Sequence, residues 1–352
     1  MKLEHVPASI RPLDKQAMEK SRKRWISIAK PLFSLGKLEK AITQIAGIRG
    51  DAKFPLEKKG LVIMCADNGV VEENVTQSGQ DITAAVTENF AKYRTSVCFM
   101  ARKAGAGLFP VDIGVSADVP GVTKPEWKLM YGTNNITKGP AMARETAVRA
   151  VELGIKKVGE LKKNGYDILA TGEMGIGNTT TSSAVASVML GQPAERMTGR
   201  GAGLSSDGLE RKVDAVKRAV AFNKPDKNDA IDVLAKVGGL DIAGMCGLFL
   251  GGAVYRLPIV IDGFISSVAA LAAARICPKA RDFMLPSHLS GEPAAALVLK
   301  ALDMEPFITC GMSLGEGSGA VMLFPLLDMA YSVYMNMCTF DSWGHGTYRI
   351  LK

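Results

Sequence analysis

At 352 residues, with 47% hydrophobic and 22% charged side chains, the chain can bury a large core, and its composition excludes a fibrous or disordered protein. Its net charge of +8 is not accompanied by a basic stripe interleaved with aromatic residues, which favours a phosphorylated small substrate over nucleic acid. The three histidines and six cysteines are scattered without a C-x-x-C pair, which argues against a zinc site and for mostly buried thiols in a reducing cytoplasm.

The first 50 residues predict at least two helices, because apolar positions recur at helical spacing and Pro31 and Gly36 interrupt the pattern. The charges and prolines of the opening MKLEHVPASIRPLD are atypical of a signal peptide. Residues 60–66 then form a continuous apolar run of strand length that ends in 67–69, Asp-Asn-Gly. Such a run indicates a strand of a parallel sheet that is buried on both faces.

Strands and helices continue to alternate along the chain. We expect helices over 82–105 and 140–163 and strands over 108–111, 166–170 and 257–261. The apolar stretches 240–255 and 259–276 are interrupted by Gly, Asp or Arg, which predicts buried elements rather than membrane spans.

This alternation predicts an α/β fold with a doubly wound, mostly parallel sheet and a small helical domain built from both ends of the chain. We assign residues 59–325 to the α/β nucleotide-binding and catalytic domain. Residues 1–58, the N-terminal helical segment, and 326–352, the C-terminal helix, are assigned to the small domain.

Three glycine-rich turns stand out, at 171–185 (TGEMGIGNTTTSSAV), 199–207 and 310–320, and the first directly follows the strand predicted over 166–170. A turn from a strand into a helix start presents backbone N–H groups and the positive end of the helix dipole to an anion. The first turn fits neither G-x-G-x-x-G nor the P-loop pattern, because no lysine follows its last glycine. It therefore predicts a phosphate site that is neither a common dinucleotide site nor an ATPase site.

Charged residues accompany these turns: Glu173 in the first, Lys212 after the second and Glu316 in the third. A carboxylate in a dry pocket can have its pKa raised and act as a general base, whereas the simpler alternative is a solvated turn acid. Three such turns on one scaffold favour the ligand site. The strand-terminal Asp67, Asp112 and Asp262 suit helix capping or ligand hydroxyls better than a metal.

Several ordered segments resemble the nicotinate-nucleotide:dimethylbenzimidazole phosphoribosyltransferases of cobamide assembly: 66–71 (ADNGVV), 171–181, 198–204 (TGRGAGL), 261–267 and 314–320 (LGEGSGA). The resemblance implies that nicotinate mononucleotide loses nicotinate while a lower-ligand base takes the ribose phosphate at C1 with inversion. The product is an α-riboside 5′-phosphate. The resemblance also implies a cytoplasmic homodimer without cofactor or metal, or a heterodimer with a similar subunit.

The resemblance assigns roles to individual residues. Glu316 matches the general base, and Glu173 matches a second carboxylate that orients the substrate or stabilises positive charge on the ribose. The residues expected to bind the phosphate and ribose are Gly175, Gly177, Asn178, Thr179, Thr180, Gly201, Gly203 and Lys212. The residues expected in the base pocket are Ser78, Gln80, Met174 and Leu314.

Three departures from the family pattern fall on the expected base-facing wall. The family usually has Asp-His-Gly at 67–69, an aromatic residue and a proline near 76–80, and a histidine at the end of the segment 290–295. We therefore expect the same donor with an acceptor other than dimethylbenzimidazole, such as a phenol, a purine or another benzimidazole.

Two other functions fit the same pattern. The first is a non-catalytic or partner-dependent subunit of a related heteromeric phosphoribosyltransferase, against which the intact Glu316 argues. The second is phosphoribosyl transfer from a magnesium-pyrophosphate donor, which would make the reaction depend on metal.

Overall fold

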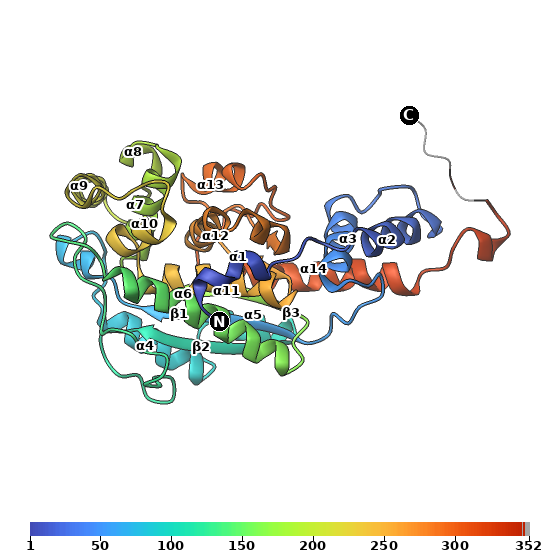
Figure 1. The fold of residues 1–352 in the computed structure, drawn as a ribbon, viewed down its shortest axis with the longest axis horizontal. Coiled ribbons are helices and arrows are strands. Elements are labelled where there is room, and N and C mark those ends of the chain that lie inside the picture. The colour runs from blue at the N-terminus through green and yellow to red at the C-terminus, as the bar shows by residue number, and fades with distance from the viewer. Residues whose placement is uncertain (347, 349–352) are drawn as a thin grey trace.

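The computed structural model describes residues 1–346 and 348, and its centre is a parallel sheet of five strands in the order β2-β1-β3-β4-β5 (Figure 1). The strands are β1 (Lys59–Ala66), β2 (Ala106–Gly114), β3 (Ile168–Met174), β4 (Ile259–Ile261) and β5 (Met284–Pro286). All eight residues of β1 are buried, as its continuous apolar sequence predicts. Pro110 lies in β2, at an edge of the sheet, where a missing N–H donor is tolerated.

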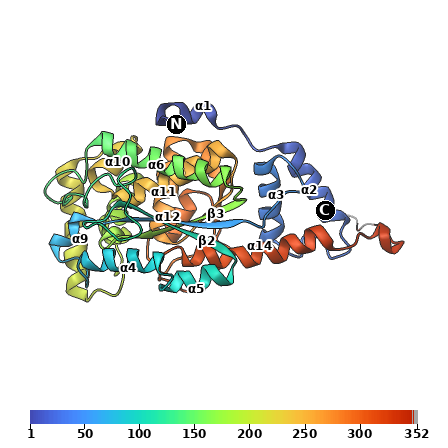
Figure 2. The same ribbon diagram turned by 90° about the horizontal axis from the view of Figure 1, so that it is seen from below.

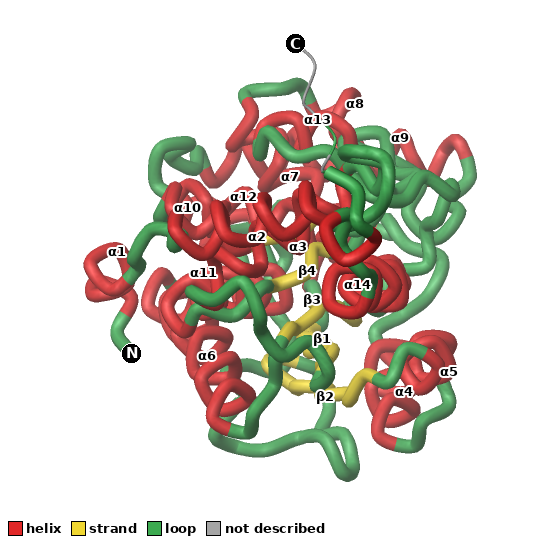
Figure 3. Tube along the Cα trace, turned by 90° about the vertical axis from the view of Figure 1, so that its right-hand side faces the viewer, coloured by secondary structure: helices red, strands yellow, loops and turns green. Residues whose placement is uncertain are grey.

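Helices cover both faces of the sheet, which confirms the predicted α/β class (Figure 3). In chain order they are α1 (Val6–Ser9), α2 (Lys15–Ser27), α3 (Lys37–Arg49), α4 (Asp81–Ala91), α5 (Ser96–Lys103), α6 (Arg144–Lys163), α7 (Asn178–Leu190), α8 (Ala194–Met197), α9 (Ser206–Asn223), α10 (Ala230–Val237), α11 (Leu240–Tyr255), α12 (Phe264–Ile276), α13 (Ala295–Ala301) and α14 (Ser318–Asn336). The helical segment expected over 82–105 forms two helices, α4 and α5, and Tyr93 adopts a left-handed conformation (φ 55°) between them.

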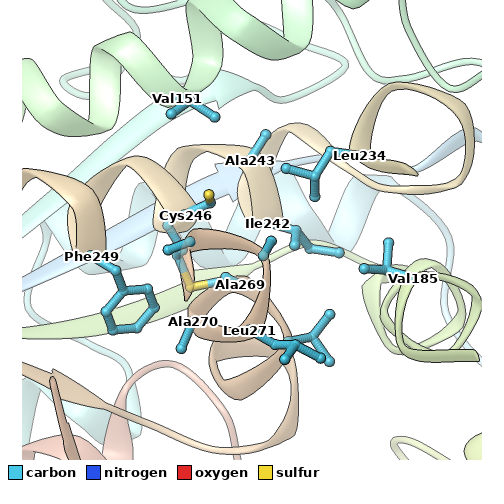
Figure 4. Packing of buried hydrophobic residues seen from close by; sticks show 14 of the residues in the cluster. Val151, Val185, Leu234, Ile242, Ala243, Cys246, Phe249, Ala269, Ala270 and Leu271 are labelled. Atoms are coloured by element: carbon cyan, nitrogen blue, oxygen red, sulfur yellow. The ribbon is translucent and has the colours of Figure 1, made fainter. Parts of the chain in front are cut away.

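The larger core cluster surrounds α11, which is buried along most of its length between α6 and α12 (Figure 4). Glycine allows this close packing: a Cβ at Gly247 would lie 2.0 Å from the carbonyl oxygen of Val151 in α6. Four cysteines are buried as expected, whereas Cys310 and Cys338 are exposed.

The opposite face of the sheet packs against α4, α5 and α14, and the far end of α14 reaches α2 and α3 (Figure 2). There the Trp25 and Tyr334 rings lie 4.9 Å apart, and Arg24 Nε donates to the Tyr334 carbonyl at 3.0 Å. Because α14 is one continuous helix from 318 to 336, the boundary expected after residue 325 falls inside it. The division into two domains stays a prediction.

Within the described part of the chain, α14 is the one helix long and apolar enough to suit a membrane span. Half of that segment is buried inside the protein, however, and both ends of the helix are bonded to other elements. The apolar stretches 240–255 and 264–276 form the shorter helices α11 and α12, both largely buried.

Candidate active site

The glycine-rich turns meet beyond the carboxyl ends of β3 and β4, around a cavity of about 260 Å³. Ligands of open α/β sheets bind at this edge. Eight of the residues assigned to the site from the sequence line the cavity: Glu173, Met174, Gly175, Asn178, Thr179, Gly201, Leu314 and Glu316. The strand-terminal Asp262 lines it as well.

Glu316 has an unusual backbone for a residue with a side chain, with φ 62° between two left-handed glycines. Asp262 fixes this turn, because its carboxylate accepts from the Gly317 amide at 3.1 Å and the Ala320 amide at 3.0 Å. Asp262 is therefore a capping residue, as expected, but it caps α14 rather than the helix that follows it in the chain. Gly172 in β3 leaves space for the turn, since a Cβ there would lie 2.5 Å from the Glu316 carbonyl oxygen.

Two buried carboxyl groups share one amide. Asn178 Nδ2 donates to Glu173 and, at 3.0 Å, to Asp241 Oδ2. Burial and the neighbouring Asp241 charge raise the pKa of Glu173 to about 8, and burial raises the pKa of Asp241 to about 7. At neutral pH Glu173 is thus mainly protonated and can donate a hydrogen bond to a ligand.

Helix α9, which follows the second turn, carries a buried lysine. Lys212 Nζ donates to Thr179 Oγ1 at 2.8 Å and to the Gly199 carbonyl at 3.0 Å, joining the first and second turns. Burial lowers the pKa of Lys212 to about 8, against an opposing effect of the Glu292 carboxylate. A cation, hydroxyl groups and the start of α7 together form a site that suits a phosphate dianion.

The other expected site residues lie outside the cavity lining. Gly177 (φ 93°) is the residue before α7, and Thr180 is buried in that helix with its hydroxyl unpaired. The Gly203 carbonyl accepts from Gln77. The Ser78 carbonyl accepts from Thr76, and Gln80 Nε2 donates to the Asn68 carbonyl at 3.4 Å. The roles assigned to these residues stay predictions.

Several polar residues at the cavity were not assigned from the sequence. Glu292 lines it and accepts from the Gly201 amide at 2.9 Å, while its second oxygen is buried without a partner. His288 also lines it, with Nε2 3.8 Å from Asp262 Oδ1, although the sequence shows only dispersed histidines. In the sequence, two signals pointed to these carboxylates: a glycine pair at 238–239, two residues before Asp241, and Gly291 directly before Glu292.

The placement of Asn68 corrects one expectation. Asn68 is fully buried behind the first turn, where it accepts from Thr181 Oγ1 at 3.3 Å, and it does not line the cavity. The asparagine that stands where the family usually has histidine therefore packs beneath the backbone of Gly175. A Cβ added at Gly175 would lie 3.1 Å from Asn68 Nδ2. In the residues that the structure describes, no group of three or more His, Cys, Asp or Glu side chains is arranged to hold a metal ion.

The fold and the cavity together define an α/β protein whose cavity suits a phosphorylated ligand beside carboxyl groups. A family model described as "Phosphoribosyltransferase" matches residues 10–344. A nicotinate-nucleotide–dimethylbenzimidazole phosphoribosyltransferase of Clostridium acetobutylicum is 48% identical over 352 residues, 100% of both chains. Another, of Ruminiclostridium cellulolyticum, is 50% identical over 342 residues, 97% of each chain. The chain belongs to the nicotinate-nucleotide–dimethylbenzimidazole phosphoribosyltransferase family.

A solved structure agrees with this assignment. The crystal structure of a nicotinate-nucleotide–dimethylbenzimidazole phosphoribosyltransferase from Thermus thermophilus matches with a TM-score of 0.88 and 35% identity. The match covers 96% of this chain and 100% of that one.

Proposed function

We propose that this enzyme transfers the 5-phosphoribosyl group of nicotinate mononucleotide to an aromatic lower-ligand base, producing an α-riboside 5′-phosphate for cobamide assembly. The observation that carries the proposal is one cavity lined by both Glu316 and Glu173 and by Thr179 and Gly201 of the phosphate-binding turns.

The donor phosphate binds at the start of α7 and the second turn. Lys212 lies directly behind Thr179 and Gly201, which line the cavity, and its positive charge attracts the phosphate across them. A Cβ added at Gly201 would lie 3.2 Å from the lysine nitrogen. This placement directs the ribose toward Glu173 and Glu316. Protonated Glu173 is suited to orient the donor by a hydrogen bond, rather than to balance positive charge on the ribose at neutral pH.

The chemistry needs one base. The bond between C1 and the pyridinium nitrogen breaks with its electron pair on nicotinate, which leaves without being protonated. The acceptor atom, a ring nitrogen or the oxygen of a phenol, forms a bond to C1 from the opposite face, and the acceptor releases its proton to the Glu316 carboxylate. Burial raises the pKa of Glu316 and so brings it closer to the pKa of the acceptor group whose proton it takes.

The acceptor lies against the apolar part of the cavity, which includes Met174, Phe264 and Leu314. Of the altered segments, 290–295 contributes Ser290 and Glu292 to the lining, whereas Ser78 and Gln80 lie outside it. An acceptor other than dimethylbenzimidazole stays a prediction, and a phenol, a purine or another benzimidazole are its candidates.

The test is nicotinate release from nicotinate mononucleotide by the purified chain, with benzimidazoles, purines and phenols as acceptors and the products identified by mass. We expect Glu316→Gln to lower the rate by about 100-fold or more, since general base catalysis contributes roughly 10²–10⁴-fold. Donor binding should remain, and the exposed Glu305→Gln is the matched control.

Other outcomes identify the alternatives. Full activity in Glu316→Gln would overturn the assigned base. Donor binding without turnover on any acceptor would indicate a non-catalytic or partner-dependent subunit. Loss of activity in a chelator, with turnover of a pyrophosphate donor, would indicate the magnesium-dependent reaction.

We also propose that the enzyme works as a homodimer in the cytoplasm, with a heterodimer of similar subunits as the alternative. Exposed large apolar side chains support self-association: Phe99 on α5 and Met329 on α14 are 60% and 59% exposed, and these two helices pack together.

A further inference from the structure

Among the described residues that line the cavity, His288 is the one basic side chain. It lies two residues after β5 and is only 4% exposed. The same cavity is lined by four carboxyl groups: Glu173, Asp262, Glu292 and Glu316. An imidazole among so many acids is a candidate for binding a negatively charged part of a substrate, which those acids would repel.

The imidazole ring of His288 is fixed by close packing against two glycines. A Cβ added at Gly319 in α14 would lie 2.0 Å from Cδ2 of the ring, and a Cβ added at Gly263 would lie 3.3 Å from Nε2. Nε2 also lies 3.8 Å from Asp262 Oδ1, close enough for this carboxylate to stabilise positive charge on the ring. One edge of the ring is thus held by the protein.

The other ring nitrogen has no such contact. Nδ1 of His288 is buried and makes no hydrogen bond within the part of the chain that the structure describes. A buried polar atom without a partner is costly, and native proteins usually supply one from the chain, from water or from a ligand. Because His288 lines the cavity of the proposed active site, a substrate atom is the partner that its position favours.

The proposed donor carries two anionic groups, its phosphate and the carboxylate on its pyridine ring. Lys212 is held beside the phosphate site by hydrogen bonds to Thr179 Oγ1 and the Gly199 carbonyl. The pyridine carboxylate therefore needs a second partner, because a buried anion is unfavourable without a hydrogen-bond donor or a positive charge. An imidazolium ring supplies both, and among the described lining residues His288 alone can form one.

We propose that His288 binds the carboxylate on the nicotinate ring and so selects nicotinate mononucleotide over nicotinamide mononucleotide, whose carboxamide is uncharged. This inference rests on the proposed function, in which nicotinate mononucleotide is the donor. The carboxylate does not change during the reaction, so the contact strengthens the binding of the donor rather than the chemical step. The effect belongs in the affinity and KM for the donor.

The experiment measures the dissociation constants of both mononucleotides by calorimetry without an acceptor. We expect the wild type to bind nicotinate mononucleotide about tenfold or more tightly than nicotinamide mononucleotide, as for a hydrogen bond between charged groups. His288→Gln removes the ring and its charge and should bring the two affinities within about twofold of each other. A general loss of structure would weaken both nucleotides alike and leave their ratio unchanged. His5→Gln, at a histidine whose side chain is 69% exposed, is the matched control and should keep the wild-type ratio.

A second readout uses the wild-type protein and does not depend on the folding of His288→Gln. The chain has three histidines, so ¹⁵N-histidine labelling gives few signals, and His5→Gln and His345→Gln assign the other two. The Nδ1 signal of His288 should move on addition of nicotinate mononucleotide and much less with nicotinamide mononucleotide.

Three results would overturn the inference: equal affinity of the wild type for both nucleotides, an unchanged ratio in His288→Gln, or an Nδ1 signal that responds equally to both or to neither. A wild type that shows the expected preference but releases no nicotinate with any acceptor would instead contradict the proposed transfer reaction. The two failures are therefore distinguishable.

Discussion

Single residues at this site have protonation states that their sequence positions do not reveal. Glu173 lies at the end of a strand, where an acid would ordinarily be solvated, yet it is buried and shares Asn178 with Asp241. Two carboxylates cannot both be charged at low cost in such a site, so at least one of them keeps its proton near neutral pH. The Asn178 amide compensates only part of the buried charge.

The shifted pKa of Glu173 predicts how stability depends on pH. The folded protein binds this proton more tightly than the unfolded chain, whose ordinary value is 4.5, so the free energy of unfolding should decrease as the pH rises from about 4.5 to about 8. Glu173→Gln should flatten this decrease, measured by urea unfolding at several pH values. The exposed Glu305→Gln should leave the slope unchanged. Equal slopes in the wild type and Glu173→Gln would contradict a buried, protonated Glu173.

At the scale of elements, the site is made by the junctions between strands and helices. The turn after β3 leads into α7, and the turn carrying Glu316 leads into α14 under the control of Asp262, which follows β4. The helix α9 brings Lys212 back to the first turn. The starts of α7 and α14 and the Lys212 side chain of α9 thus each contribute one part of the phosphate-binding and carboxyl geometry.

The buried lysine of α9 should act on donor binding more than on the chemical step. For Lys212→Met we expect KM for nicotinate mononucleotide to rise roughly 10- to 150-fold, the equivalent of about 1.5–3 kcal/mol for a hydrogen bond to a charged group. Thermal stability should not decrease, because methionine avoids burying a charge. Lys217→Met, on the exposed side of the same helix, is the control and should leave KM unchanged. A fall in kcat at constant KM would contradict a role in binding the phosphate.

At the scale of the whole molecule, α14 connects the catalytic turn to the helices at the N-terminus. Its first turn is bonded to Asp262 and its last turn to Arg24. The outer surface of the helix remains partly exposed in the single chain, and Met329 lies on that surface. This surface is the part of α14 that a second copy can cover.

The proposed homodimer predicts a response to charge on this surface. Light scattering should give twice the mass of one chain, and Met329→Lys should shift the equilibrium toward the monomer, because a lysine buried at an interface core is unfavourable. Phe222→Lys on α9, where the native side chain is 62% exposed, is the matched control and should leave the mass unchanged. A wild-type monomer, or a dimer insensitive to Met329→Lys, would contradict the use of this surface.

The sequence by itself determined the α/β class, the glycine-rich turns and the carboxylates Glu173 and Glu316, because buried parallel strands have continuous apolar sequences and anion-binding turns need glycine. Only the tertiary structure decided which turns meet. It brought Asp241 and Glu292 to the site from distant segments and placed Asn68 beneath the first turn. It also set the pKa values, since burial and neighbouring charges depend on groups that are far apart in the chain.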